Sequence, residues 1–454
     1  MGIAYIDSLV VVVRMVPKNV LWFIFDDLRV EHNVTYGRRH VHSPAMDRLS
    51  SSGVVFERAY AQMALCGPSR ASFMTGRRPA TTRVYNHFNH FREEGAGPSW
   101  VSLPQHFKQH GYLTLGGGKT YHPGKPPDYD APRSWSPDRP YFPHEGGNEC
   151  SEGGARVGRV IPVPPYHHAE MICTVANASA LVDARLASEA IRWLQLAQTN
   201  RSRPFFFAVG LHRPHMPWVV PADVFGRYTR TDVGLPRHPS LPAKVHPIAW
   251  NAVMKVFGDV LNGTAVGQEL SPSPSARALP WGAPCDDGRL CDQHRTREAR
   301  RGYYAAVTFA DAQMGRVLDA LDDAGYSEST LIVACGDHGF HLGEKGNWAK
   351  QTLWEEGVRV PLVIRAPWLD TAAGARIAPP VELIDLYKSA RTPHHAQDAS
   401  PATLTAHTDP HRTHACALRG SNFRARGPAA ARGGRGGSLT RPAARRPGGR
   451  HLGR

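Results

Sequence analysis

A cysteine at the start of a predicted helix is the residue that most clearly indicates chemistry in this sequence. Cys66 opens the run CGPSRASFMTG, residues 66–76. Pro68 suits the first turn of a helix and Gly76 suits its C-terminal cap. Cys66 is therefore expected at the positive end of a short helix, where Arg70 adds a cation beside any docked anion. The alternative for a single cysteine is a buried structural role.

Two carboxylates follow the first strongly apolar segment of the chain. Residues 19–25 form a continuous apolar run, NVLWFIF, which is typical of a strand buried on both faces of a parallel sheet. Asp26 and Asp27 come directly after it. Ligands collect at the carboxyl ends of strands in open α/β sheets, and adjacent buried acids are costly unless a cation neutralises them. We therefore predict a metal site here rather than a solvated turn.

Further reactive side chains follow three other predicted strands. The strands and the side chains after them are 112–115 with Lys119 and His122, 205–209 with His212 and His215, and 331–334 with Asp337 and His338. The lysine follows a glycine-rich loop, where backbone N–H groups can approach a sulfate or phosphate closely. A histidine can donate a proton to a leaving alcohol, and an Asp-His pair can bind a metal. Remote segments that meet at one sheet edge favour a shared site over unrelated surface loops.

The segment around Cys66 resembles the signature of the type I sulfatases, in which this cysteine is oxidised to formylglycine during secretion. The match covers residues 66–76 without a break. The resemblance implies an aldehyde that hydrates to a geminal diol, one hydroxyl of which attacks sulfur while the other later expels sulfate. It also implies maturation by a formylglycine-generating enzyme, because an unmodified thiol has no second hydroxyl with which to release the product.

The same resemblance implies a role for each candidate residue. One Ca²⁺ ion, or Mg²⁺ in its place, would be held by an oxygen-rich set made of Asp26, Asp27, the modified Cys66, Asp337 and His338. The sulfate would be held by Lys119, His122 and Lys350, of which the last lies in a Gly-x-Trp-Ala-Lys motif. Arg70 would help to stabilise the diol alkoxide, and His212 would protonate the departing sugar oxygen. His215 would contact the substrate.

Two short segments resemble the iduronate-2-sulfatase branch of this family. They are Gly-Lys-x-x-His-Pro-Gly at residues 118–124 and His-x-Pro-His at residues 212–215. The resemblance implies a sulfuric ester hydrolase acting on a sulfated sugar, with a 2-O-sulfated uronate of a glycosaminoglycan or similar polysaccharide as the expected substrate. Two alternatives stay open at this point: a phosphatase or phosphonate monoester hydrolase of the same superfamily, and an inactive carbohydrate-binding relative.

The expected fold is an alkaline-phosphatase-like α/β sandwich with a large mixed, mostly parallel central sheet. A lead over 1–16 would precede a catalytic domain over 17–387, within which 125–170 forms an insertion over the active face. Family members continue into a C-terminal subdomain with a small antiparallel sheet. Residues 388–454 are instead rich in Arg, Gly and Pro, which predicts a disordered tail and a missing subdomain.

Charge and hydropathy exclude two classes of partner. The net charge is +15, but residues from 391 onward hold twelve Arg against two Asp and so account for +10 of it. We therefore do not expect the folded part to bind nucleic acid. No segment approaches the roughly 20 apolar residues that span a bilayer. The apolar run at residues 10–13 is also too short for a signal-peptide core.

Cysteine and sequon usage agree with an oxidising secretory route, which the resemblance extends to a lysosomal or extracellular location. Cys150 with Cys173, and Cys285 with Cys291, flank short polar or Gly/Pro-rich stretches and could pair. Four glycosylation sequons start at Asn33, Asn177, Asn200 and Asn262.

Overall fold

One large sheet organises the part of the chain that the computed structural model describes. The described residues are 19–38, 40–93, 97–146, 155–159, 170–239, 249, 293–368 and 373–389. The strands of the sheet are β1 (Asn19–Asp26), β2 (Val54–Tyr60), β3 (Leu113–Gly118), β6 (Phe205–Pro214), β8 (Thr330–Gly336), β11 (Arg359–Arg365), β12 (Arg376–Ile377) and β13 (Val381–Glu382). Their spatial order is β12-β2-β11-β8-β1-β6-β3, and β13 pairs with β2. Only β11 runs antiparallel to its neighbours, so the predicted mixed, mostly parallel sheet is confirmed.

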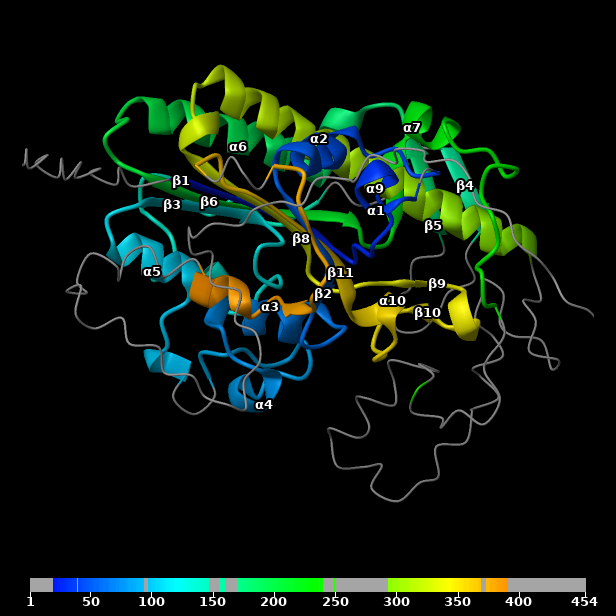
Figure 1. The fold of residues 1–454 in the computed structure, drawn as a ribbon, viewed down its shortest axis with the longest axis horizontal. Helices are drawn as coiled ribbons and strands as arrows, with labels where there is room; N and C mark the ends of the chain where they lie inside the picture. Colours follow the sequence, from blue (N-terminus) through cyan, green and yellow to red (C-terminus); the bar gives the residue numbers. More distant parts are fainter. Residues whose placement is uncertain are drawn as a thin grey trace, which may run out of the picture. The chain divides into compact units, whose positions relative to one another are not determined.

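Helices cover both faces of this sheet (Figure 1). One face carries α2 (Pro44–Ser52), α6 (Val182–Gln198) and α9 (Gln293–Asp323), and the other carries α3 (Cys66–Thr75) and α5 (Leu103–Gln109). Side chains of β1 alternate between the two cores, because successive residues of a strand point to opposite faces. Leu21 and Phe23 pack in the core under α6 and α9, and Val20 and Trp22 pack in the core under α3 and α5.

Short elements complete the described structure. The helices are α1 (Asn33–Tyr36), α4 (Pro79–Thr82), α7 (Ala222–Gly226) and α10 (Glu355–Val358), and the single 3₁₀ turns are Gly97–Ser99, Pro127–Asp130, Ala178–Ala180, Ser327–Ser329 and Glu344–Gly346. The remaining strands are β4 (Ala155–Arg159), β5 (Glu170–Val175) and β7 (Trp218–Pro221) in one small sheet, and β9 (His341–Leu342) with β10 (Trp348–Ala349) in another. Among the described helices, none combines the length and the apolar character needed to cross a membrane.

Two strands extend further than the sequence analysis predicted. The stretch 116–118 was expected to be a loop, but it belongs to β3 and pairs with β6. Likewise β6 continues to Pro214, so His212 lies inside a strand and not in the loop after it. Both corrections have one cause: β6 is hydrogen-bonded on either side, to β1 and to β3, and this pairing overrides the local signals of Gly and Pro.

Several predictions concern residues that the structure does not describe. The lead at 1–16 and the tail from 390 onward lie outside the described residues, as do most of 147–169 and of 240–292. Cys173 is disulfide-bonded. Its predicted partner Cys150 lies outside the described residues, as do Cys285 and Cys291, so both pairings stay predictions.

Glycines lie on both strands at the point where the chain leaves β3 and passes close to β6. Gly118 has φ +62, and the amide N–H of Lys119 donates to the carbonyl oxygen of Gly210 at 2.7 Å. A Cβ atom on Gly210 would overlap the backbone of Thr120 and Lys119. The absence of a side chain at Gly210 therefore lets the segment that carries Lys119 turn toward the carboxyl ends of the strands.

We predict that Gly210→Ala destabilises the protein by about 1–3 kcal/mol, because the added methyl group meets backbone atoms that cannot rotate away. Gly226→Ala is the matched control, since a Cβ there would have no atom within 4 Å. Urea unfolding of both variants measures the difference. Equal stability of the two variants would show that this close approach can relax and that its packing is unimportant.

Candidate active site

Helix α3 holds Cys66 at its first residue, inside the protein. Leu65 is the N-cap, and Gly76 is the C-cap in the left-handed conformation with φ 64. All ten residues of the helix are buried. The helix predicted from Pro68 and Gly76 is therefore confirmed, and the cysteine lies at the end of the helix where unpaired N–H groups favour negative charge.

The parallel strands β3, β6, β1 and β8 bring remote residues to the Cys66 thiol. Because these strands are neighbours, their carboxyl ends lie along one edge of the sheet. Cys66 Sγ lies 3.2 Å from Asp26 Oδ1, 3.3 Å from His338 Nε2 and 3.0 Å from Lys350 Nζ. Residues from positions 26 to 350 thus surround a single sulfur atom.

Three buried carboxylates near the thiol are matched by three cations. Lys119 forms an ion pair with Asp26. Lys350 Nζ lies 2.6 Å from Asp27 Oδ1, and Arg70 Nη2 lies 2.9 Å from Asp337 Oδ2. Arg70 also reaches Asp26 at 3.5 Å. Every one of these six side chains is buried, so each charge depends on its partner rather than on water.

The pKa values of the carboxyl groups follow from this pairing. Burial alone would raise the pKa of Asp26, but Lys119 and the other nearby cations outweigh it and hold that pKa well below its usual range. Burial would also raise the pKa of Asp27, but the charge of Lys350 outweighs this effect, so the pKa of Asp27 is lowered as well. Burial raises the pKa of Asp337 to about 8, with repulsion from Asp26 and Asp27 adding to the effect. The repulsion among the three buried carboxyl groups thus acts mainly on Asp337, which binds a proton more readily than Asp26 or Asp27 does.

The Cys66 thiol is protonated at neutral pH. Burial raises its pKa to about 12, and the negative charge of Asp26 adds to this effect. Lys119 and Lys350 act in the opposite direction but do not reverse it. Since the thiolate is the nucleophilic form of cysteine, the unmodified side chain is poorly suited to attack a substrate.

Four of the five predicted metal ligands lie close enough to share an ion. Atoms of Asp26, Asp27, Cys66 and His338 lie within 4.8 Å of one another. Among the described residues, Asp27 Oδ2 is buried without a hydrogen-bond partner, and Asp26 Oδ2 is buried against the ammonium group of Lys119. Carboxylate oxygens buried in this way, beside a nitrogen and a position suited to a further oxygen, fit a divalent cation.

Asp337 is arranged differently from the other four predicted ligands. Its Oδ1 accepts the amide N–H groups of Asp27, at 3.0 Å, and of His338, at 2.8 Å. Its Oδ2 faces Arg70 and lies 3.5 Å from His338 Nε2. Asp337 therefore ties the ends of β1 and β8 together, and its predicted role as a ligand stays a prediction.

A second group of possible ligand atoms lies on the other side of Asp26. It consists of Asp26, His212 and His215, again within 4.8 Å. The ammonium group of Lys119 already forms an ion pair with Asp26. Burial lowers the pKa of both histidines, and the charge of Lys119 adds to this effect. This second group therefore already holds a positive charge, and the predicted roles of the two histidines in proton transfer and substrate contact stay predictions.

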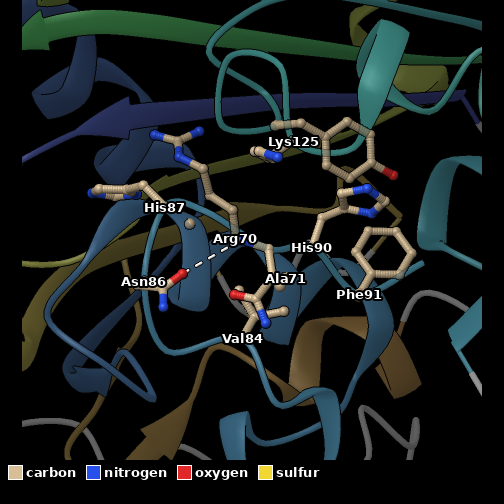
Figure 2. Close-up of a pocket in the computed structure, with 11 residues that line it drawn as sticks. Arg70, Ala71, Val84, Asn86, His87, His90, Phe91 and Lys125 are labelled. Carbon is tan, nitrogen blue, oxygen red and sulfur yellow. Dashed lines mark hydrogen bonds between the residues drawn. The ribbon is translucent and has the colours of Figure 1, made fainter. Parts of the chain in front are cut away.

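His122 lies beside a histidine that the sequence analysis did not select. The rings of His87 and His122 stack with centroids 4.2 Å apart and planes 16° apart. Figure 2 shows a pocket in which His87 lies on one side of Arg70, with His90 and Lys125 on the other. Nothing in the spacing of His87 marks it in the sequence, because it follows no predicted strand.

Two further residues near His212 were also missed. The amide N–H of His212 donates to Asp183 Oδ1 at 2.6 Å, and His212 Nδ1 lies 2.7 Å from His144 Nε2. Asp183 lies in the first turn of α6 and could not be told from an ordinary helix-start acid. His144 belongs to the stretch that was interpreted as an insertion over the active face, which indicated its region but not the residue.

Comparison with known proteins identifies the family. The model of the family described as "Sulfatase" matches residues 18–391. The chain belongs to the sulfatase family. It is 37% identical over 374 residues to iduronate 2-sulfatase of Mus musculus, a match that covers 80% of this chain and 62% of the relative. It is 36% identical over 380 residues to iduronate 2-sulfatase of Homo sapiens, covering 81% and 63% respectively. This sulfatase-family chain thus spans less than two thirds of the length of these relatives.

A solved structure agrees with the fold of this sulfatase-family member. The phosphonate monoester hydrolase SpPMH from Silicibacter pomeroyi superposes with a TM-score of 0.58 at 23% sequence identity. The superposition covers 83% of this chain and 72% of the hydrolase. The predicted alkaline-phosphatase-like α/β class is therefore confirmed.

We predict that Ca²⁺ raises the melting temperature of the protein and that a chelator reverses the increase. Binding to the folded state alone stabilises it by about 3 kcal/mol when the free ion is at 100 times its Kd. Asp27→Asn removes one buried charge of the ligand group and should abolish most of this response. Asp319→Asn, at an acid whose side chain is 62% exposed, is the control and should respond like the parent. An unchanged response in Asp27→Asn would contradict the cation site.

Proposed function

We propose that this chain is a sulfuric ester hydrolase that removes sulfate from a sulfated sugar. The observation that carries the proposal is the position of Cys66 at the start of α3, with Asp26, His338 and Lys350 within 3.3 Å of its sulfur. A nucleophile precursor, a cation site and a lysine for the sulfate thus share one small buried volume. The catalytic unit would be the segment over 17–387, in line with the extent of the family match.

Cys66 would act after conversion to formylglycine by a formylglycine-generating enzyme. The protonated, buried thiol is a weak nucleophile, whereas a hydrated aldehyde offers two hydroxyl groups on the same carbon. One hydroxyl attacks the sulfur of the ester, and the second loses its proton and restores the aldehyde as sulfate leaves. In the structure, Sγ marks the place of an oxygen on that carbon.

The cation of this site would be Ca²⁺, with Mg²⁺ as the alternative. Asp26, Asp27, His338 and the modified Cys66 would hold it together with Asp337, and this oxygen-rich set suits calcium better than zinc. When bound, the ion would stabilise negative charge on the attacking oxygen. Arg70, which is fully buried beside Asp26 and Asp337, would add to this stabilisation.

The remaining residues would bind the sulfate and move a proton. Lys119 pairs with Asp26 and Lys350 pairs with Asp27, and both lysines stay charged because these partners outweigh the effect of burial on their pKa. With His122 they would hold the sulfate oxygens as charge develops. His212 would protonate the departing sugar oxygen through Nε2, and His215 would contact the substrate.

The substrate would be a 2-O-sulfated uronate of a glycosaminoglycan or similar polysaccharide. The two relatives named iduronate 2-sulfatase support this choice, together with the segments at 118–124 and 212–215. Because formylglycine forms during secretion, we place the enzyme in the secretory pathway, the lysosome or the extracellular space. A phosphatase or phosphonate monoester hydrolase is the second candidate, since the same lysines and arginine suit a phosphoryl group.

We predict that Cys66→Ala abolishes hydrolysis of sulfate esters and leaves the fold intact. Cys335 is the matched control, because it is the other free, buried cysteine among the described residues and its sulfur contacts Trp22 rather than the site. Cys335→Ala should therefore lower stability slightly and keep turnover. Mass spectrometry of the peptide that contains Cys66 should show the aldehyde in the active parent. Turnover that persists in Cys66→Ala would refute the mechanism.

We also predict a ranking of substrates. The purified protein should hydrolyse a uronate-terminated oligosaccharide with a 2-O-sulfate faster than the analogue that carries a phosphate at the same position. It should also hydrolyse 4-nitrophenyl sulfate faster than 4-nitrophenyl phosphate. Steady-state kcat/KM values give the comparison. Activity confined to the phosphate esters would favour the second candidate, and activity on none of the four would refute both.

A further inference from the structure

A second histidine holds one side of the His212 ring. His144 Nε2 lies 2.7 Å from His212 Nδ1, and the two ring centroids are 4.7 Å apart. His212 Nε2, on the opposite side of the ring, is buried and has no hydrogen-bond partner among the described residues. The two nitrogens of His212 therefore have different surroundings: His144 anchors one, and the other faces the site.

His144 is itself fixed by the end of β3. Just before it, Phe142 exchanges backbone hydrogen bonds with the strand, donating to Gly116 O at 3.1 Å and accepting from Gly118 N at 2.8 Å. The Tyr141 hydroxyl donates to Gly118 O at 2.8 Å. The segment that carries His144 thus follows the same strand that leads to Lys119, so the ring is held relative to the rest of the site.

The backbone of His212 is fixed from another direction. Asp183, in the first turn of α6, accepts the amide N–H of His212 at 2.6 Å and the guanidinium of Arg213 at 2.7 Å. Asp183 is fully buried. Two separate contacts therefore determine where His212 Nε2 points: Asp183 sets the position of the main chain and His144 sets the rotation of the ring.

We propose that His144 is a positioning residue that keeps His212 in the orientation and tautomer required to protonate the leaving alcohol. This inference rests on the proposed sulfatase function. For Nε2 of His212 to give up a proton, Nδ1 must keep its own hydrogen, because imidazole without either hydrogen is a strongly basic anion. That Nδ1–H needs an acceptor, and His144 Nε2 supplies it when the hydrogen of His144 is on Nδ1.

The charge state of His144 agrees with the role of acceptor. Burial lowers the pKa of His144 to about 4, and the charge of Lys119 adds to this effect. His144 is therefore neutral at neutral pH and keeps a lone pair for His212. A protonated His144 would have none and would point a second N–H at the ring of His212.

The proton balance of the step is simple. As the alkoxide oxygen of the hydrated formylglycine bonds to sulfur, the bond between sulfur and the sugar oxygen breaks, and its electron pair stays on the sugar oxygen. The Nε2–H bond of His212 breaks as the O–H bond of the alcohol forms, while the Nδ1–H bond to His144 is kept. His144 thus accepts the Nδ1–H of His212 both in the cationic form before transfer, which burial disfavours in the free protein, and in the neutral tautomer after it.

Two esters with different leaving groups test this role. A sugar alkoxide needs a proton as it departs, whereas the phenolate of 4-nitrophenyl sulfate departs without one. We expect His144→Phe, which keeps a ring but no acceptor, to lower kcat for the sulfated uronate about 10- to 100-fold with little change in KM. The same variant should hydrolyse 4-nitrophenyl sulfate almost as fast as the parent. His212→Ala should show the same dependence on the leaving group, to a larger extent.

Two further variants separate positioning from folding. His144→Gln should restore most of the activity, because its side-chain oxygen can accept the same hydrogen bond, and His110→Leu, at an exposed histidine after α5, should behave as the parent. Equal losses on both esters, no loss in His144→Phe, or failure of His144→Gln to restore activity would overturn the proposal. If a melting curve shows that His144→Phe is unfolded, the decisive quantity is the ratio of kcat for the sulfated uronate to kcat for 4-nitrophenyl sulfate in His144→Gln. A ratio far below that of the parent overturns the acceptor role. A parent inactive on both sulfate esters would overturn the proposed function itself.

Discussion

The compensation of buried charge at the ends of β1 and β8 is the interaction on which the rest of the site depends. Asp26, Asp27 and Asp337 are matched by Lys119, Lys350 and Arg70 in the protein interior. Removing one partner of a buried ion pair leaves an uncompensated charge and costs about 3–5 kcal/mol. The six residues come from five separate parts of the chain, so the charge cluster ties the fold together and constrains each of those parts.

Hydrogen bonds from two other elements hold the main chain at Asp27, next to this cluster. Asp27 has φ 64, a left-handed conformation that Asp tolerates better than most residues, and its amide N–H donates to Asp337 Oδ1. Its carbonyl oxygen accepts the hydroxyl hydrogen of Tyr303, and Tyr303 in turn accepts the amide N–H of Arg29. Helix α9 therefore holds the turn after β1 from one side while β8 holds it from the other. These hydrogen bonds fix the backbone of the turn, and the turn in this conformation directs both carboxylates into the site.

Sequence alone predicted the elements whose signals are local. The apolar run of β1 and the Pro68 and Gly76 limits of α3 both correspond to observed elements. The extension of β3 through its glycines and of β6 through Pro214 could not be predicted, because it depends on hydrogen bonds to neighbouring strands. The candidate site was predicted through residues that follow strands. His144, His87 and Asp183 were missed because the structure, not their spacing, brings them to it.

The balance of charge also explains why a cation and a sulfate ester belong together in this site. The three carboxyl groups and three cations of the cluster sum to zero when Asp337 is ionised and to +1 when it is protonated, so the side chains alone offer little net attraction to an anionic ester. Lys119 and Lys350 are needed to neutralise Asp26 and Asp27, and the same two groups are proposed to hold the sulfate. A divalent cation shared by Asp26 and Asp27 adds two positive charges and takes over the neutralisation, which leaves both lysines an excess of positive charge for the substrate. The affinity for sulfate and the stability of the fold should therefore depend on the cation to a similar extent, because both depend on the charge of the same carboxylates.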